Sequence, residues 1–183
     1  MLTAEIDALR QQFEQRAAEA DALVAPLSDA EFTRAPASGG WSVAQCIDHL
    51  NATAREYLPR IDEGIADAIR RGTYGEGPYE YNWIGRLCVY AMGPPVRLRA
   101  KAPTAFQPAA PRGRNEIMAA FRAYQVQYVD RLRQANGIDL ARARVASPLA
   151  TWLRLPLGSA FELMLAHERR HLWQAAQVLK SIR

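Results

Sequence analysis

The sequence predicts an all-α fold in one domain, residues 1–183. Four long segments carry apolar residues at steps of three and four positions, the period of a helix with one buried face. Helix-capping residues stand near the ends of these segments, and a composition of 49% hydrophobic and 23% charged residues is typical of a soluble folded protein. A chain of this length can bury one core, so no second domain needs to be assumed.

The first predicted helix spans about residues 3–24 and ends before Pro26, which cannot continue it. Ser28 and Glu31 have the spacing of a capping box, so a short helical turn is expected next. A pair of glycines then breaks the chain. The buried stripe of the first helix is expected to consist of Leu2, Ile6, Leu9, Phe13, Ala17, Ala20 and Val24.

The second long helix is predicted to start at Ser42 and to end near Gly72. Ser42 and Gln45 can form a capping box, in which each side chain pairs with an otherwise unpaired amide of the other residue. Gly72 stands where a glycine commonly caps the end of a helix. Pro59 lies inside the segment, and because it lacks an amide donor and crowds the preceding turn, we expect a kink there.

The connection over residues 72–114 is rich in glycine and proline and would be unusually long for a structureless loop in a compact domain. A short helix is therefore predicted near residues 80–92. The third long helix is predicted for residues 115–134, with an Asn-Gly pair as its stop signal. The long connection would permit a crossover between the second and third long helices, so the helix pattern alone leaves the topology open.

The last long helix is predicted to open at a third capping box, from Ser159 to Glu162, and to run nearly to Arg183. One stripe of this helix consists of Met164, His167, His171, Gln174 and Val178. A second, adjoining stripe is apolar and consists of Phe161, Leu165, Leu172, Ala175 and Leu179. Both stripes are expected to face the core.

The formal net charge of +4 is mild, but segment 86–114 contains no acid. This basic segment could face an anionic ligand, although a solvated loop is the favoured interpretation. No nucleic-acid-binding motif accompanies it, so a nucleic-acid partner is not expected. Its basic residues are Arg86, Arg97, Arg99, Lys101, Arg112 and Arg114.

The expected compartment is the cytoplasm. The N-terminus carries acids where a secretory signal needs basic residues, and no apolar run approaches membrane-spanning length. Two cysteines, Cys46 and Cys88, are too few for a disulfide framework and are expected to stay thiols.

The chain has only three histidines, and they form a candidate metal site. His167 and His171 are four residues apart, which places both imidazoles on one face of the last helix, about one turn apart. His49 lies seven residues past the cap of the second long helix and is the third candidate metal ligand. A buried neutral imidazole needs a hydrogen-bond partner or a metal, so ordinary hydrogen bonding remains the alternative interpretation.

Residues near these histidines allow further interpretations. Residues 167–171 match the zinc-protease pattern H-E-x-x-H, but residues 172–183 contain no further ligand, so Glu168 is expected at the surface or behind the ligands instead. Cys46 lies one turn before His49 and could offer a thiolate, although a small packed residue is favoured. Trp41 is expected to pack over the end of its helix.

These residues resemble the DinB-like superfamily of metal-binding four-helix bundles. The resemblance rests on residues 41–50 and on His167–His171 followed by Gln174, and the order of the helices extends it over essentially the whole chain. It implies an up-down-down-up four-helix bundle. It also implies that His49, His167 and His171 hold one divalent transition metal, zinc or nickel, in a possible homodimer.

Known branches of this superfamily include bacillithiol S-transferases and mycothiol-dependent maleylpyruvate isomerases. The resemblance therefore implies a metal-dependent enzyme, with a thiol S-transferase that activates a low-molecular-weight thiol as the leading hypothesis. An open metal site could instead activate water, which would make a hydrolase. A non-enzymatic metal- or ligand-binding stress protein is the third hypothesis, since no substrate signature of a named branch is present.

Overall fold

The computed structural model describes residues 1–81, 83–94, 102–108 and 112–182. Over these residues the chain is mostly helical, with one small antiparallel sheet of two strands. The elements are α1 (Ala4–Val24), α2 (Asp29–Thr33), α3 (Val43–Arg70), α4 (Trp83–Met92), the 3₁₀ turn η1 (Thr104–Phe106), α5 (Arg114–Gln134), β1 (Arg144–Ser147), β2 (Ala150–Pro156) and α6 (Leu157–Ile182).

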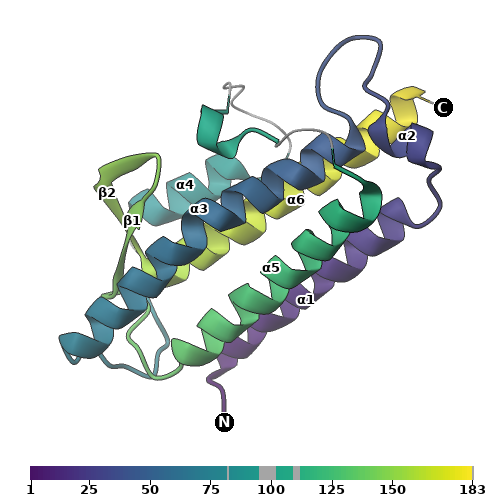
Figure 1. The fold of residues 1–183 in the computed structure, drawn as a ribbon. Coiled ribbons are helices and arrows are strands. Elements are labelled where there is room, and N and C mark those ends of the chain that lie inside the picture. The colour runs from purple at the N-terminus through teal and green to yellow at the C-terminus, as the bar shows by residue number, and fades with distance from the viewer. Residues whose placement is uncertain (82, 95–101, 109–111, 183) are drawn as a thin grey trace.

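The four long helices lie side by side (Figure 1). α3 packs against both α5 and α6, and α1 packs against the same two helices. In Figure 1, α1 and α6 run toward the upper right, whereas α3 and α5 run the opposite way. The prediction of a predominantly helical fold is confirmed. None of the helices in the described ranges is both long enough and apolar enough to cross a membrane.

The capping boxes that precede α2 and α3 are present as predicted. The Ser28 hydroxyl accepts from the Glu31 amide, and the Glu31 carboxylate accepts from the Ser28 amide. Ser42 and Gln45 make the same reciprocal pair at the start of α3. These two hydrogen bonds fix Ser42 and Gln45 relative to each other. The first turns of α3, which carry the candidate site, therefore start at a defined residue.

The C-terminus of α3 also follows the prediction. Gly72 has a φ of +63°, a left-handed conformation that glycine adopts without steric cost. Its amide donates to the Ile69 carbonyl, and the Thr73 amide donates to the Ala68 carbonyl, which together form a Schellman cap. The helix continues through Pro59 to this cap without interruption, and the expected kink stays a prediction.

The last helix starts two residues earlier than predicted, and the capping box expected at Ser159 is wrong. Ser159 is completely buried inside α6, whose first residue is Leu157. Backbone carbonyls take the role of the side-chain cap: the Leu157 amide donates to Ala143, and the Gly158 amide donates to Leu140. These bonds satisfy amides that would otherwise be unpaired at a buried helix start.

The hairpin of β1 and β2 was not predicted. It packs beside α3, and Val145 pairs with Leu155 so that both side chains are buried. The tip of the hairpin carries Leu149, which reaches the cavity described below. The hairpin therefore forms part of the cavity wall, which the helical pattern of the sequence does not indicate.

A close approach between α3 and β1 requires glycine at position 64. A Cβ atom there would lie 2.8 Å from the Arg144 carbonyl oxygen and 3.0 Å from the Val145 Cγ2 atom. Alanine favours a helix over glycine by about 1 kcal/mol, but overpacking a core contact costs about 1–3 kcal/mol. We expect Gly64→Ala to lower the free energy of unfolding by about 1 kcal/mol, the difference between these two effects, in urea titrations. An unchanged or raised midpoint would mean that the hairpin can move away from α3.

The core of the described residues consists of two apolar clusters. One is built around Phe13, which stacks on Tyr128 with a ring-centroid distance of 4.6 Å and meets Phe161 edge-on. The other contains Ile47 and Phe121. Between the clusters, early turns of α3 and the middle turns of α5 and α6 contribute buried polar residues, which we call the polar belt: Asp48, His49, Asn51, Thr53, Gln125, His167, Glu168 and His171.

Candidate metal centre

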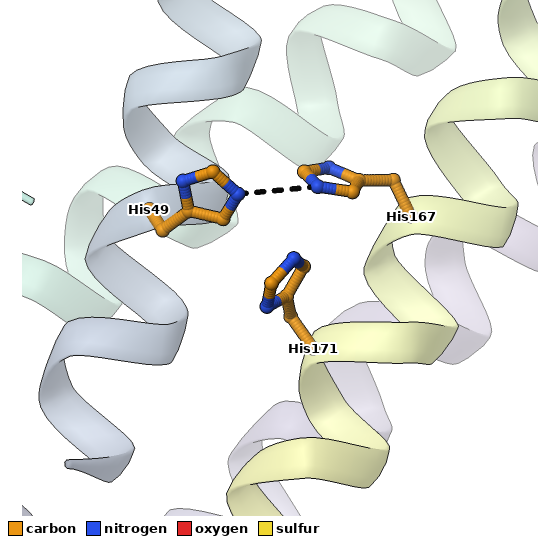
Figure 2. A group of neighbouring side chains, drawn as sticks. All are labelled: His49, His167 and His171. Carbon is orange, nitrogen blue, oxygen red and sulfur yellow. Dashed lines mark hydrogen bonds between the residues drawn. The ribbon is translucent and has the colours of Figure 1, made fainter. Parts of the chain in front are cut away.

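All three histidines of the chain come together in the polar belt. His49 projects from α3, and His167 and His171 project from successive turns of α6 (Figure 2). Each is buried, and one nitrogen of each ring lies within 4.8 Å of one nitrogen of each of the others. The four-residue spacing puts both imidazoles of α6 on one face of that helix, and this face lies against His49 of α3. The sequence predicted this convergence.

The nitrogen separations suit a common metal ion. His49 Nε2 and His167 Nε2 are 3.1 Å apart. Two imidazole nitrogens bound to one tetrahedral zinc ion at about 2.0–2.1 Å would lie roughly 3.3 Å apart. One His171 nitrogen points toward the space between the other two rings (Figure 2). The His49–His167 pair thus already has about the separation that a common zinc ion needs, and the His171 ligand atom lies within 4.8 Å of both.

A backbone carbonyl orients the ring of His49. Its Nδ1 atom lies within hydrogen-bond distance of the Phe106 carbonyl oxygen, which is at the end of η1. A carbonyl can only accept, so Nδ1 carries the proton and the lone pair is left on Nε2, facing His167. This is the arrangement of metal-ligating histidines, in which the outer nitrogen donates to a fixed acceptor.

Burial keeps the three imidazoles in the form that binds metal. Desolvation lowers the pKa of His49 and lowers that of His167 well below its ordinary value. Desolvation also lowers the pKa of His171, to about 3. All three rings are therefore neutral at pH 7, with lone pairs available. His171 Nδ1 is buried and has no hydrogen-bond partner within the part of the chain that the structure describes.

The histidines line a cavity of about 1180 Å³. Its wall combines residues of α3, α4 and α6 with the segment around η1 and the hairpin tip. Aromatic and apolar groups dominate this wall, and they include Trp41, Phe106, Met164 and Trp173. Trp41 lies directly on the cluster, with its ring centroid 4.7 Å from that of His49 and 5.8 Å from that of His171. Trp41 is therefore part of the site wall as well as a neighbour of the helix cap.

Two other candidates from the sequence do not join the site. Cys46 is buried but is not among the side chains whose ligand atoms converge with the histidines, and burial raises the pKa of its thiol to about 12. Glu168 is buried, which excludes the surface position considered for it. It accepts a hydrogen bond from Gln125 on α5 at 2.9 Å, and desolvation raises its pKa to about 8.

The basic segment is divided among several environments. Arg112 pairs with buried Asp48, beside His49, and Arg114 pairs with Asp29 at 2.9 Å. Arg86 is exposed on α4. The remaining basic residues, Arg97, Arg99 and Lys101, lie outside the described residues. The two arginines at the end of the segment thus contact acids of this chain rather than face the cavity.

Several residues of the site have no signal in the sequence. Thr53 and Tyr57 face the cavity from α3, and Arg170 and Trp173 face it from α6. Their placement depends on which helices meet, so no spacing rule identifies them. The Phe106 carbonyl is also invisible to pattern analysis because any residue supplies a carbonyl.

A comparison with protein-family models matches residues 12–175 to the family described as the DinB superfamily. The matched region begins inside α1, ends inside α6 and includes all three histidines. Comparisons with curated proteins and with solved structures gave no match.

Proposed function

This chain belongs to the DinB superfamily, and from that premise we propose that it is a metal-dependent thiol S-transferase. In this proposal His49, His167 and His171 hold one divalent transition metal, zinc or nickel. The substrate is a small molecule, a low-molecular-weight thiol. Family membership and the helix directions in Figure 1 also support an up-down-down-up four-helix bundle formed by one domain, residues 1–183.

The observation that carries this proposal is the convergence of three buried, neutral imidazoles on the wall of a cavity. Catalytic zinc sites hold the ion with three protein ligands and leave a position for water or substrate, whereas structural sites use four. Only three ligand side chains meet here among the described residues, and the cavity beside them gives a small molecule access. This combination favours an enzyme over a protein that only stores metal.

A divalent ion bound by these residues would lower the pKa of a coordinating thiol and so supply a thiolate near neutral pH. The protein contributes orientation and exclusion of water. The Phe106 carbonyl holds His49 in the productive tautomer, and the apolar wall around Trp41 keeps the cluster desolvated. The cavity then brings the thiol and its electrophile together.

The residues that line the cavity favour a thiol over water as the nucleophile. Hydrolysis at a metal site commonly uses a carboxylate as general base, and no Asp or Glu is found among the described residues of the cavity wall. Two acids are next in sequence to a candidate ligand, and both contact other residues: Glu168 accepts a hydrogen bond from Gln125 of α5, and Asp48 pairs with Arg112. A coordinated thiol needs no separate base, since coordination itself removes its proton.

The first test concerns the metal. We expect tag-free protein purified without chelator to contain about one divalent transition-metal ion per chain, because three imidazoles converge on one point. Elemental analysis measures this ratio. Absence of metal in the purified protein, combined with failure to take up added zinc or nickel, would contradict the proposed metal centre.

The second readout concerns the thiol. Cobalt(II) can replace zinc as a coloured probe, and a thiolate bound to it gives a sulfur-to-metal absorption band in the near ultraviolet. We expect cysteamine to produce this band in the cobalt-loaded protein, whereas its alcohol analogue ethanolamine should not. A cobalt-loaded protein that gave no such band with a panel of small thiols would contradict thiol activation while leaving the metal centre in place.

A further inference from the structure

One cationic side chain stands on the wall of the cavity. Arg170 lies on α6 between His167 and His171, and it lines the same cavity as the histidines. Its neighbours on the wall are uncharged or are the histidines themselves, which are neutral. Among the described residues of the wall, Arg170 carries the one permanent charge.

The charge of Arg170 acts on the whole cluster. Arg170 directly precedes His171 on α6 and lines the same cavity as all three rings, so its positive charge lies on the wall that they share. Arg170 is half-buried, and burial lowers its own pKa. An arginine side chain nevertheless stays protonated in proteins, so the cavity has a positive potential even without a metal.

We propose that Arg170 binds an anionic group, a carboxylate, on the small molecule that occupies this cavity. The proposal deepens the proposed function, on which it rests for the role of the cavity as a substrate site. A guanidinium presents parallel N–H donors that match the two oxygens of a carboxylate, and such charge-assisted pairs are about twice as strong as neutral hydrogen bonds.

The proposal also defines the substrate class. The substrate would have a carboxylate at Arg170, a reactive group at the histidines and a body that contacts the apolar and aromatic wall at Trp41, Phe106 and Trp173. Arg112 and Arg114 of the basic segment pair with Asp48 and Asp29 away from the cavity wall, whereas Arg170 lies on that wall.

Arg169 offers a matched control because it is the adjacent arginine but faces another way. It lies outside the wall of the histidine cavity, and its Nη1 atom donates to Gln12 on α1 at 3.4 Å. Arg169→Gln and Arg170→Gln therefore remove the same charge from neighbouring positions of one helix. Only the second removes it from the cavity.

The experiment compares the binding of phenylacetate with that of its uncharged amide, phenylacetamide, by titration calorimetry. The full-length protein is used as purified and again after treatment with chelator, which separates a carboxylate bound by Arg170 from one bound by metal. We expect the chelated wild-type protein to prefer the carboxylate by about tenfold or more. Arg170→Gln should lose this preference, and Arg169→Gln should keep it.

Arg170→Lys serves as the conservative variant and should keep a smaller preference, because lysine retains the charge without the planar fork. Circular dichroism verifies that each variant is folded, and the lysine variant still decides the question if the glutamine variant is not. No carboxylate preference in chelated wild type, or an equal preference in Arg170→Gln, would overturn the role of Arg170. A preference that depends on Arg170 in a protein that binds no metal would support this role and contradict only the metal centre.

Discussion

Replacing His171 with alanine is expected to weaken binding of a divalent ion by at least about a hundredfold while the helical content stays unchanged. Loss of a residue that merely orients a ligand already costs about ten- to a hundredfold in metal affinity, so loss of a ligand should cost more. Competition with a coloured chelator measures the affinity, and circular dichroism measures the helical content.

The fold should survive because His171 contributes little to the apolar clusters. The residue belongs to the polar belt, and its Nδ1 atom has no hydrogen-bond partner among the described residues. The ring is also hydrogen-bonded to Gln174, but this amide lines the cavity as well, where water can replace the lost partner. The helices remain held by contacts such as the stack of Phe13 on Tyr128.

Trp173→Ala is the matched control for this prediction. Trp173 lies on the same helix two residues later and lines the same cavity, but its side chain offers no metal ligand. Trp173→Ala should bind the divalent ion as tightly as the wild-type protein does. If His171→Ala bound the ion as tightly as the wild type does, His171 would be removed from the ligand set. If both variants lost it equally, the loss would reflect damage to the cavity rather than to a ligand.

The sequence predicts the helices well because their signal is periodic and local. The stripes of the long helices and the capping boxes at Ser28 and Ser42 depend on residues within one or two turns, and the structure contains both boxes. The convergence of the histidines was predictable for a related reason. The spacing of His167 and His171 fixes their common face, and both helices must turn their apolar stripes toward one core.

The features that sequence analysis missed depend on contacts between distant segments. β1 has only four residues, too few for an alternating pattern to be distinguished from a loop. The start of α6 depends on carbonyls of Leu140 and Ala143, so a plausible capping box at Ser159 misplaced it by two residues. Arg170 had no pattern of its own, and its role emerges only when the cavity is assembled from separate elements.

The division of the core into two apolar clusters explains why the site can be polar without destabilising the fold. Each cluster buries aromatic and aliphatic side chains at one end of the bundle, and the polar belt takes the middle. Side-chain bonds within the belt connect helices, since Asn51 donates to the Ile117 carbonyl and Gln125 donates to Glu168. The candidate metal centre thus lies on rigid elements, which holds its side chains in place.

The largest effect on activity is expected from removal of the metal. We expect metal-loaded protein to accelerate the attack of a small thiol on chlorodinitrobenzene and the chelated protein to show only the background rate, a difference of at least about a hundredfold. In this reaction the thiol loses its proton to solvent, a carbon–sulfur bond forms, and the carbon–chlorine bond breaks to release chloride. The increase in absorbance of the aryl thioether measures the rate.

The expected size of this rate difference follows from the ionisation of the thiol. A free thiol with a pKa of about 8.5 is only a few per cent thiolate at pH 7, so complete ionisation alone contributes roughly thirtyfold. Holding the thiol and the electrophile in one cavity contributes the remainder. His49→Ala should reduce the rate as strongly as chelation does, because His49 is the proposed ligand whose tautomer the Phe106 carbonyl fixes. Added metal should restore the chelated wild type but not this variant.

The outcomes of this assay separate the three functional hypotheses. Turnover of thiols that requires both metal and His49 supports the S-transferase. Metal-dependent hydrolysis of activated esters or amides without any thiol turnover would replace it with a hydrolase, despite the absence of Asp and Glu from the described cavity wall. If metal-loaded protein catalysed neither reaction across a broad panel, the cavity would be a binding site for a ligand, and the cluster would serve to hold that ligand rather than to activate it.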